Sequence, residues 1–199
     1  MNCISDHVKI KFVPDKIKNL MGREKQLSKI VKSVMDGQST IMLLGLHGVG
    51  KSALAKNAIH YMLERKYFTG GVMFVNLKGV SKFSQLTVKL KKTITKHLDL
   101  NYGNIRDELE NVSSESFVDF LVDLFDAKDL DAKLKYKKKC GDSTVHKFLL
   151  CLDNAEELIT DSADQFSDFI SKMASCVLVT TLITSNRYSS QKFYVMRDG

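Results

Sequence analysis

The most informative segment of this chain is Thr40-Ile-Met-Leu-Leu-Gly-Leu-His-Gly-Val-Gly-Lys-Ser52. Apolar residues run up to Gly45 and predict a buried strand, and the pattern Gly-x-x-x-x-Gly-Lys-Ser follows at 45–52. Apolar residues then recur at helical spacing, at Leu54, Ala55, Ala58, Ile59, Met62 and Leu63. The motif therefore lies between a strand and a helix, which is the context that a phosphate-binding loop (P-loop) requires.

The residue types in this loop suit a phosphate. Glycines allow the backbone to curl so that successive N–H groups point inward, and the helix start adds unpaired N–H groups and a positive dipole end. Lys51 is expected to reach the β- and γ-phosphates of a nucleotide, and the Ser52 hydroxyl to bind Mg²⁺. The predicted cofactor-binding residues of the loop are Gly45, Leu46, His47, Gly48, Val49, Gly50, Lys51, Ser52 and Ala53. The alternative is a glycine-rich turn without a ligand.

Composition is typical of one folded domain. The chain has 199 residues, of which 44% are hydrophobic and 27% charged, with a single proline, so a real core is expected and disorder is not. No apolar run approaches the roughly 18 residues of a membrane span, and no signal-peptide pattern is present. We therefore expect a soluble protein without a membrane partner, in the cytoplasm or alternatively the nucleus. The 4 cysteines form no Cys-x-x-Cys pair, which argues against zinc and against a disulfide scaffold.

Strands and helical stripes alternate along the chain. Besides the strand before Gly45, strands are expected at 72–76, 147–152, 176–184 and 193–196. Helices are expected around 27–35, 54–63, 82–98, 117–125 and 166–173, with a loop at 99–112. Such alternation indicates βαβ units. The predicted fold is α/β, a three-layer α/β/α P-loop domain with a mainly parallel five-stranded sheet. It would occupy 20–199, after a lead-in segment or short strand at 1–19.

A second candidate for phosphate chemistry ends the third strand. Phe148-Leu-Leu-Cys-Leu-Asp153 delivers a carboxylate to the edge of the sheet where ligands of parallel sheets bind. Asp153 would hold Mg²⁺ beside Ser52; alternatively it is a solvated acid. The next residue, Asn154, cannot act as a base. Glu156 is the candidate base, or else a helix-start acid favoured by the dipole.

The fourth strand ends in Ile183-Thr-Ser-Asn-Arg187. A guanidinium at this edge, bidentate and permanently charged, could sense the γ-phosphate; the alternative is a surface arginine. The predicted catalytic residues are Lys51, Asp153, Glu156 and Arg187, and the predicted metal ligands are Ser52 and Asp153.

Together these segments resemble the STAND branch of P-loop ATPases, in particular the NB-ARC domains of apoptosis regulators and plant resistance proteins. The stretches that carry the resemblance are Leu20-Met-Gly-Arg-Glu24, the P-loop through Ala55, Leu149–Glu156 and Ile183–Arg187. The resemblance implies a signal-transducing ATP/ADP switch that uses Mg²⁺. It also implies that Leu20, Met21 and Arg23 contact the adenine and ribose, and that Arg187 is a sensor.

The chain departs from the family pattern at several points. Asn154 stands where many members have a second Asp, so slow or absent hydrolysis is expected. Asn186 is an extra residue before Arg187. No counterpart of the family's helical lid or winged-helix region follows, so we expect a bare nucleotide-binding core. Protein partners or self-association would then act through domains that this sequence lacks.

Two other function classes are also compatible with the sequence. The first is an AAA+ ATPase of the origin-recognition type, in which basic residues contact DNA phosphates: Lys89, Lys91, Lys92, Lys96 and the cluster at 135–139. The net charge of +7 fits nucleic acid or simple solubility, and a solvated helix face with a lysine-rich loop is the favoured interpretation of these lysines. The second is a small-molecule kinase, for which neither a substrate-binding insert nor lid arginines are identified.

Overall fold

The computed structural model describes residues 10–17, 20–97, 103–113, 115–125, 147–187 and 194–197. Within them, six strands form a single sheet in the order β1-β3-β4-β5-β2-β6, and every pair of neighbouring strands is parallel. The strands are β1 Ile10–Phe12, β2 Thr40–Leu44, β3 Gly71–Asn76, β4 Phe148–Asp153, β5 Val179–Ser185 and β6 Tyr194–Arg197. The predicted α/β class and parallel sheet are confirmed.

The predicted number of five strands is wrong. Four central strands of 5 to 7 residues are flanked by two edge strands of 3 and 4 residues. The additional strand is β1, which lies in the segment 1–19, where a lead-in segment or a short strand was expected, and it pairs Ile10 with Gly71 and Phe12 with Met73. Three residues are too few to show a clear periodicity in the sequence.

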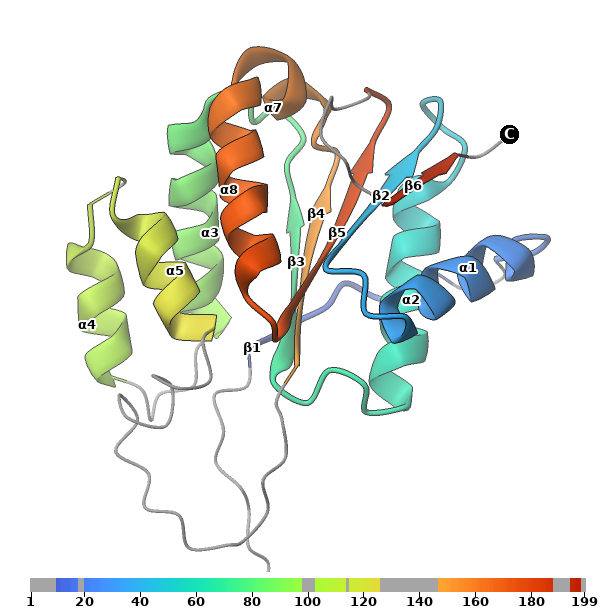
Figure 1. The fold of residues 1–199 in the computed structure, drawn as a ribbon, viewed down its shortest axis with the longest axis horizontal. Helices are drawn as coiled ribbons and strands as arrows, with labels where there is room; N and C mark the ends of the chain where they lie inside the picture. The colour runs from blue at the N-terminus through green and yellow to red at the C-terminus, as the bar shows by residue number, and fades with distance from the viewer. Residues whose placement is uncertain are drawn as a thin grey trace, which may run out of the picture.

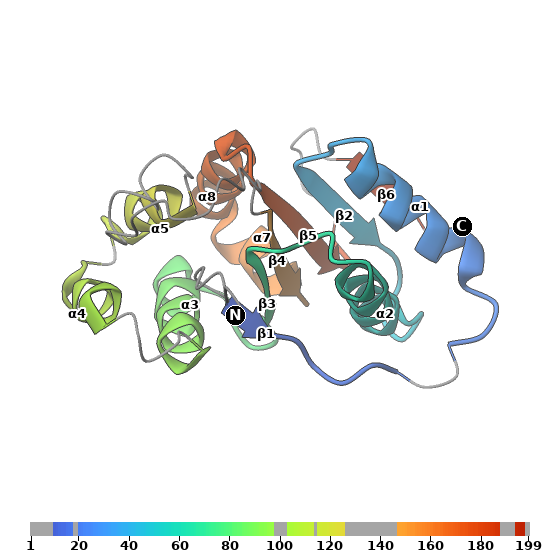
Figure 2. The ribbon, with the colours of Figure 1, turned by 90° about the horizontal axis from the view of Figure 1, so that it is seen from below.

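Helices cover both faces of the sheet, which gives three layers (Figures 1 and 2). The helices are α1 Glu24–Met35, α2 Lys51–Glu64, α3 Phe83–His97, α4 Gly103–Asn111, α5 Phe117–Phe125, α7 Glu156–Asp161 and α8 Ala163–Ser175. One face carries α1 and α2, and the other carries α3, α5, α7 and α8. The prediction of a loop at 99–112 is wrong for Gly103–Asn111, where α4 forms, and its part at 99–102 lies outside the described residues. Its segment is mostly polar, yet Leu109 is fully buried in the core. No described helix has the length and apolarity needed to cross a membrane.

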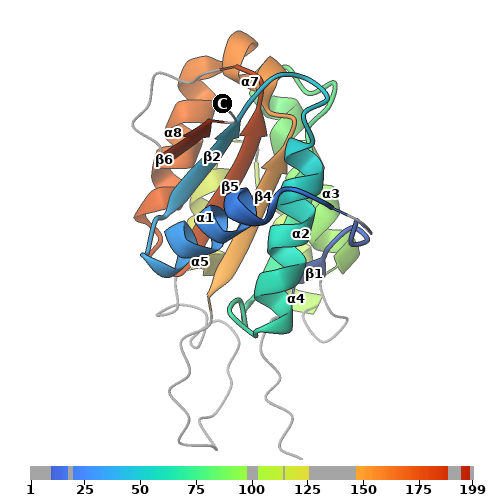
Figure 3. The ribbon, with the colours of Figure 1, turned by 90° about the vertical axis from the view of Figure 1, so that its right-hand side faces the viewer.

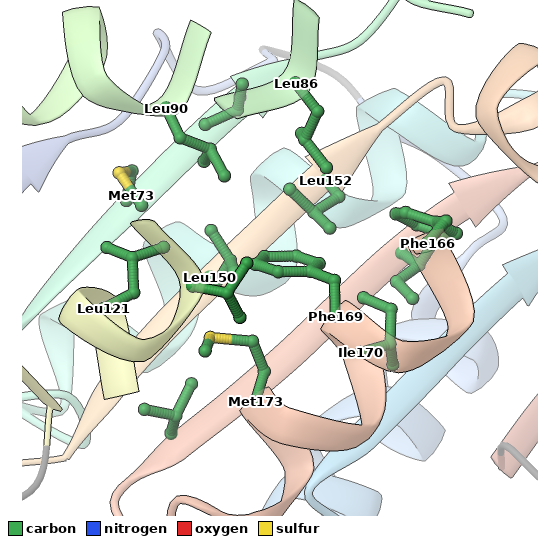
Figure 4. Packing of buried hydrophobic residues seen from close by; sticks show 14 of the residues in the cluster. Met73, Leu86, Leu90, Leu121, Leu150, Leu152, Phe166, Phe169, Ile170 and Met173 are labelled. Atoms are coloured by element: carbon green, nitrogen blue, oxygen red, sulfur yellow. The ribbon is translucent and has the colours of Figure 1, made fainter. Parts of the chain in front are cut away.

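Alternating side chains of β4 build both halves of the core. Phe148, Leu150 and Leu152 enter the cluster under α3, α5 and α8, which Figure 4 shows from close by. Leu149 and Cys151 enter the cluster under α1 and α2. Burial, together with the nearby Asp153 carboxylate, raises the pKa of the Cys151 thiol. A strand covered on both faces reads as a continuous apolar run, which is why β4 was recognisable from the sequence.

Residues 13–17 lie along α2, so the amino-terminal chain is tied to the helix that follows the P-loop (Figure 3). His60 Nε2 is 2.8 Å from the Pro14 carbonyl oxygen. Lys16 donates to Glu64 at 3.0 Å, and this contact lowers the pKa of the Glu64 carboxyl. Phe12 and Val13 pack against the cluster under α1 and α2. These contacts hold α2 from its outer side.

Gly70, the residue before β3, provides a test of how the Phe148 ring is packed. A Cβ at this position would lie 2.7 Å from two carbon atoms of the Phe148 ring. We expect Gly70→Ala to lower the free energy of unfolding by about 1–3 kcal/mol, the usual cost of overpacking, in urea denaturation. In a Phe148→Leu background the same substitution should cost less, because the clashing ring is gone. An equal cost in both backgrounds would contradict the proposed clash.

Candidate functional site

The predicted site residues are gathered by the ends of parallel strands. β2 leads into the P-loop, β4 ends at Asp153 and β5 ends at Ser185, and all three ends lie at the same edge of the sheet, at the top of Figure 1. The Gly45 N–H donates to the Ser185 carbonyl oxygen at 3.3 Å, which joins the start of the loop to the end of β5. This edge is where ligands of open parallel sheets bind.

The P-loop has the backbone conformation that its glycines permit. Gly48 and Gly50 have φ of +84° and +89°, values that side chains with a Cβ rarely adopt. No atom lies within 4 Å of a Cβ built on either glycine, so the space beside them is open. Within the described residues no side chain caps the amino end of α2. Its first N–H groups are therefore available to an anion.

Lys51 folds back onto this loop. Its ammonium donates to the carbonyl oxygens of Gly45 and Leu46, both at 2.8 Å. These contacts hold a positive charge at the inner side of the loop. A phosphate oxygen can replace a carbonyl as acceptor and gains a charge-assisted hydrogen bond.

The segment predicted to contact the base is only partly gathered at the loop. Arg23 donates through Nη2 to the Val49 carbonyl oxygen, so its side chain reaches the P-loop. Leu20 packs against the core under α1 and α2. Met21 is 84% exposed and Leu46 is 79% exposed, so both present apolar surface to solvent.

Asp153 is a buried carboxylate that accepts hydrogen bonds from neutral groups. The residue is 3% exposed. Its Oδ1 accepts from the Thr184 hydroxyl at 2.6 Å, and its Oδ2 accepts from the Asn154 amide at 3.1 Å. In the described part of the chain no Lys or Arg forms an ion pair with it. Buried charges in proteins are usually paired or coordinate metals, so this donor set suits a divalent cation.

Asn154 connects three strand ends. Its φ is +62°, a conformation that Asn tolerates better than most residues. Its backbone N–H donates to Thr184 Oγ1 at 2.9 Å, and its amide also donates to Asn76 Oδ1 at 2.9 Å. Sequence reasoning missed Asn76 as a site residue. The signal was present, because Asn76, like Asp153, is a polar residue that ends a buried strand.

The two remaining candidates differ in how the structure presents them. Glu156 begins α7, and its Oε2 is buried with no hydrogen-bond partner among the described residues. Arg187 is exposed. Its backbone N–H donates to the Ser185 hydroxyl and its carbonyl oxygen accepts from that hydroxyl, both at 2.9 Å. Ser185 ends β5, the strand that Arg187 follows. The structure therefore leaves the roles of Glu156 and Arg187 as predictions.

The lysines considered for DNA contact are not all available. The ammonium of Lys91 donates to the Val112 carbonyl oxygen and lies 5.6 Å from the centroid of the Phe117 ring. This lysine therefore joins α3 to the α4–α5 connection. The cluster at 135–139 lies outside the described residues.

The parallel sheet, the glycine loop and Lys51, and the buried carboxylate opposite them define a P-loop NTPase. The family model described as Novel STAND NTPase 1 matches residues 10–192. The chain belongs to this family, and the resemblance to the STAND branch is confirmed.

Solved structures share the fold at low sequence identity. One is a STAND protein with a tetratricopeptide repeat sensor from Pyrococcus horikoshii, with a TM-score of 0.56 and 12% identity over 92% of this chain and 23% of that one. ORC from Drosophila, bound to DNA, has a TM-score of 0.60 and 14% identity, and the match covers 96% of this chain and 45% of that one. The ORC1 protein of Aeropyrum pernix, in complex with DNA, has a TM-score of 0.56 and 17% identity, and the match covers 87% of this chain and 40% of that one. The chain thus spans less than half of each of these proteins. Comparison with curated proteins gives no match.

Two threonines of β5 provide a matched test of the site. Both are fully buried, but only the Thr184 hydroxyl has partners, Asp153 and the Asn154 N–H, whereas Thr181 Oγ1 has none among the described residues. We expect Thr184→Val to lower the free energy of unfolding by about 1–3 kcal/mol, because it leaves buried groups unpaired. Thr181→Val should be close to neutral or stabilising. Equal losses from the two variants in urea denaturation would refute the assigned network.

Proposed function

We propose that this chain is an ATP/ADP-binding switch of the NB-ARC type that uses Mg²⁺ and hydrolyses ATP slowly. The observation that carries the proposal is that a phosphate-binding loop and a buried carboxylate lie at one edge of the sheet. An open glycine loop with the Lys51 ammonium lies at the same edge as the buried Asp153 carboxylate, which forms no ion pair among the described residues. Family membership supports nucleotide binding.

Each residue then has a defined task. Lys51 and the N–H groups at the start of α2 bind the phosphates. Ser52 and Asp153 hold the metal, whose charge offsets that of the phosphate oxygens when it is bound. Met21 and Arg23 border the base and ribose, and Leu20 supports this segment from the core.

Slow hydrolysis follows from the groups next to Asp153. The Asn154 amide cannot accept a proton, and its NH₂ group already donates to Asp153 and Asn76. Glu156 is the nearest following carboxylate in the sequence, and its unpartnered Oε2 makes it our candidate base. Arg187 is our candidate γ-phosphate sensor, and its exposed side chain would have to turn toward the nucleotide.

The first functional prediction concerns the loop lysine. We expect Lys51→Ala to weaken binding of Mg²⁺–ATP at least about tenfold, or roughly 1.4 kcal/mol, because a charge-assisted phosphate contact is lost. Calorimetry measures this directly. Lys66→Ala is the matched control, since Lys66 is exposed just beyond the far end of α2, and it should bind like the parent. Equal affinities of Lys51→Ala and the parent would exclude the P-loop assignment.

A second functional prediction separates two neighbouring acids. Turnover of ATP should stay below about 1 s⁻¹, at the low end of ordinary enzymes. Glu156→Gln should reduce this residual rate by about a hundredfold, the size of a general-base contribution, without loss of nucleotide affinity. Glu157→Gln is the control, because Glu157 is exposed and accepts from the Gly79 N–H at 3.1 Å. If Glu156→Gln turns over like the parent, another group activates the water.

A further inference from the structure

Asn76 lies beside Asp153 at the ends of two adjacent strands. The two residues are register partners in the β3–β4 pair. Asn154 links them, since its Nδ2 donates to Asn76 Oδ1 at 2.9 Å and to Asp153 Oδ2 at 3.1 Å. Three side chains thus form a short relay from the exposed end of β3 to the buried carboxylate.

The direction of this relay is set by the backbone. The Lys78 N–H donates to Asn76 Oδ1 at 3.0 Å, so this oxygen, and not the amide nitrogen of Asn76, faces the turn. Asn76 therefore presents an acceptor to Asn154, and both N–H bonds of the Asn154 amide are used as donors. The Asn154 backbone is held as well, through its own N–H to Thr184 Oγ1 at 2.9 Å.

The relay fixes the Asp153 carboxylate from one side while Thr184 fixes it from the other. Its Oδ1 is held at 2.6 Å by Thr184 and its Oδ2 at 3.1 Å by Asn154. An ionised carboxylate has about four lone-pair sites, so each oxygen keeps acceptor capacity for a cation. Partners that orient a metal ligand typically contribute 10–100-fold in metal affinity.

We infer that Asn76 is a positioning residue for the Mg²⁺ site. Asn76 acts on the Asp153 carboxylate through the Asn154 amide. This inference rests on the proposed function. The competing explanation is that Asn76 only closes the turn at Lys78, and the side chain of Asn154 takes no part in that turn. Asn76 is exposed and lies outside both core clusters, so its substitution leaves the core intact.

The test is the gain in affinity for a fluorescent ATP analogue on going from excess EDTA to saturating Mg²⁺. Asn76→Ala should reduce this gain about tenfold, while affinity in EDTA stays at the parent value. Asn154→Gly, in which glycine tolerates the positive φ, should reduce the Mg²⁺-dependent gain by the same factor. The Asn76→Ala/Asn154→Gly double variant should show no larger reduction than either single variant, because both residues act through one pathway. Asn76→Asp keeps the acceptor and should retain the gain. Asn111→Ala is the control, since Asn111 is an exposed amide of α4 that donates to the Asp107 carbonyl oxygen within its own helix.

Each contrary result is distinct. An unchanged gain in Asn76→Ala, equal weakening with and without Mg²⁺, or additive effects of Asn76→Ala and Asn154→Gly would overturn the positioning role and leave the proposed function standing. A parent protein that fails to bind the analogue under either condition would overturn the proposed function itself, and the positioning role with it.

Discussion

Parallel pairing of four buried strands is the constraint on which the rest of this structure depends. Because β3, β4, β5 and β2 run in one direction, their carboxyl ends meet at one edge. Residues separated by about a hundred positions in the sequence, such as Gly45 and Asp153, are thereby brought to the same place. The helices that cover the two faces keep this arrangement rigid, since each central strand contributes side chains to both core clusters.

Charge at this edge is separated and only partly compensated. The Lys51 ammonium rests on two backbone carbonyls, and the Asp153 carboxylate rests on a hydroxyl and an amide. Both charges are thus solvated by neutral protein groups, and in the described residues they form no ion pair with each other. An anion beside the Lys51 ammonium and a cation beside the Asp153 carboxylate would each add the opposite charge to a group that neutral atoms contact. A metal-bound polyphosphate carries both in a single ligand.

Strong, continuous signals in the sequence were sufficient for the central fold and the loop. The apolar run before Gly45, the glycine spacing and the run before Asp153 each predicted the element that the structure contains. The weaker signals were ambiguous for a physical reason. β1 has too few residues for a period, so the sequence left a lead-in segment and a short strand as alternatives at 1–19. The helix α4 was missed because its segment is mostly polar. Side-chain contacts were harder still. No spacing rule shows that Leu20 packs into the core, or that the Asn154 amide is held by Asn76, because these contacts depend on how distant segments meet.

The short strand β1 has a consequence for the handling of this protein. It covers the outer edge of β3, whose N–H and C=O groups would otherwise face solvent along a strongly apolar strand. Exposed edges of this kind pair readily with other chains. A shortened protein that begins at Leu20 would keep the whole P-loop yet lose this protection, together with the clamp of residues 13–17 on α2. Aggregation of such a fragment would therefore reflect an uncovered sheet edge.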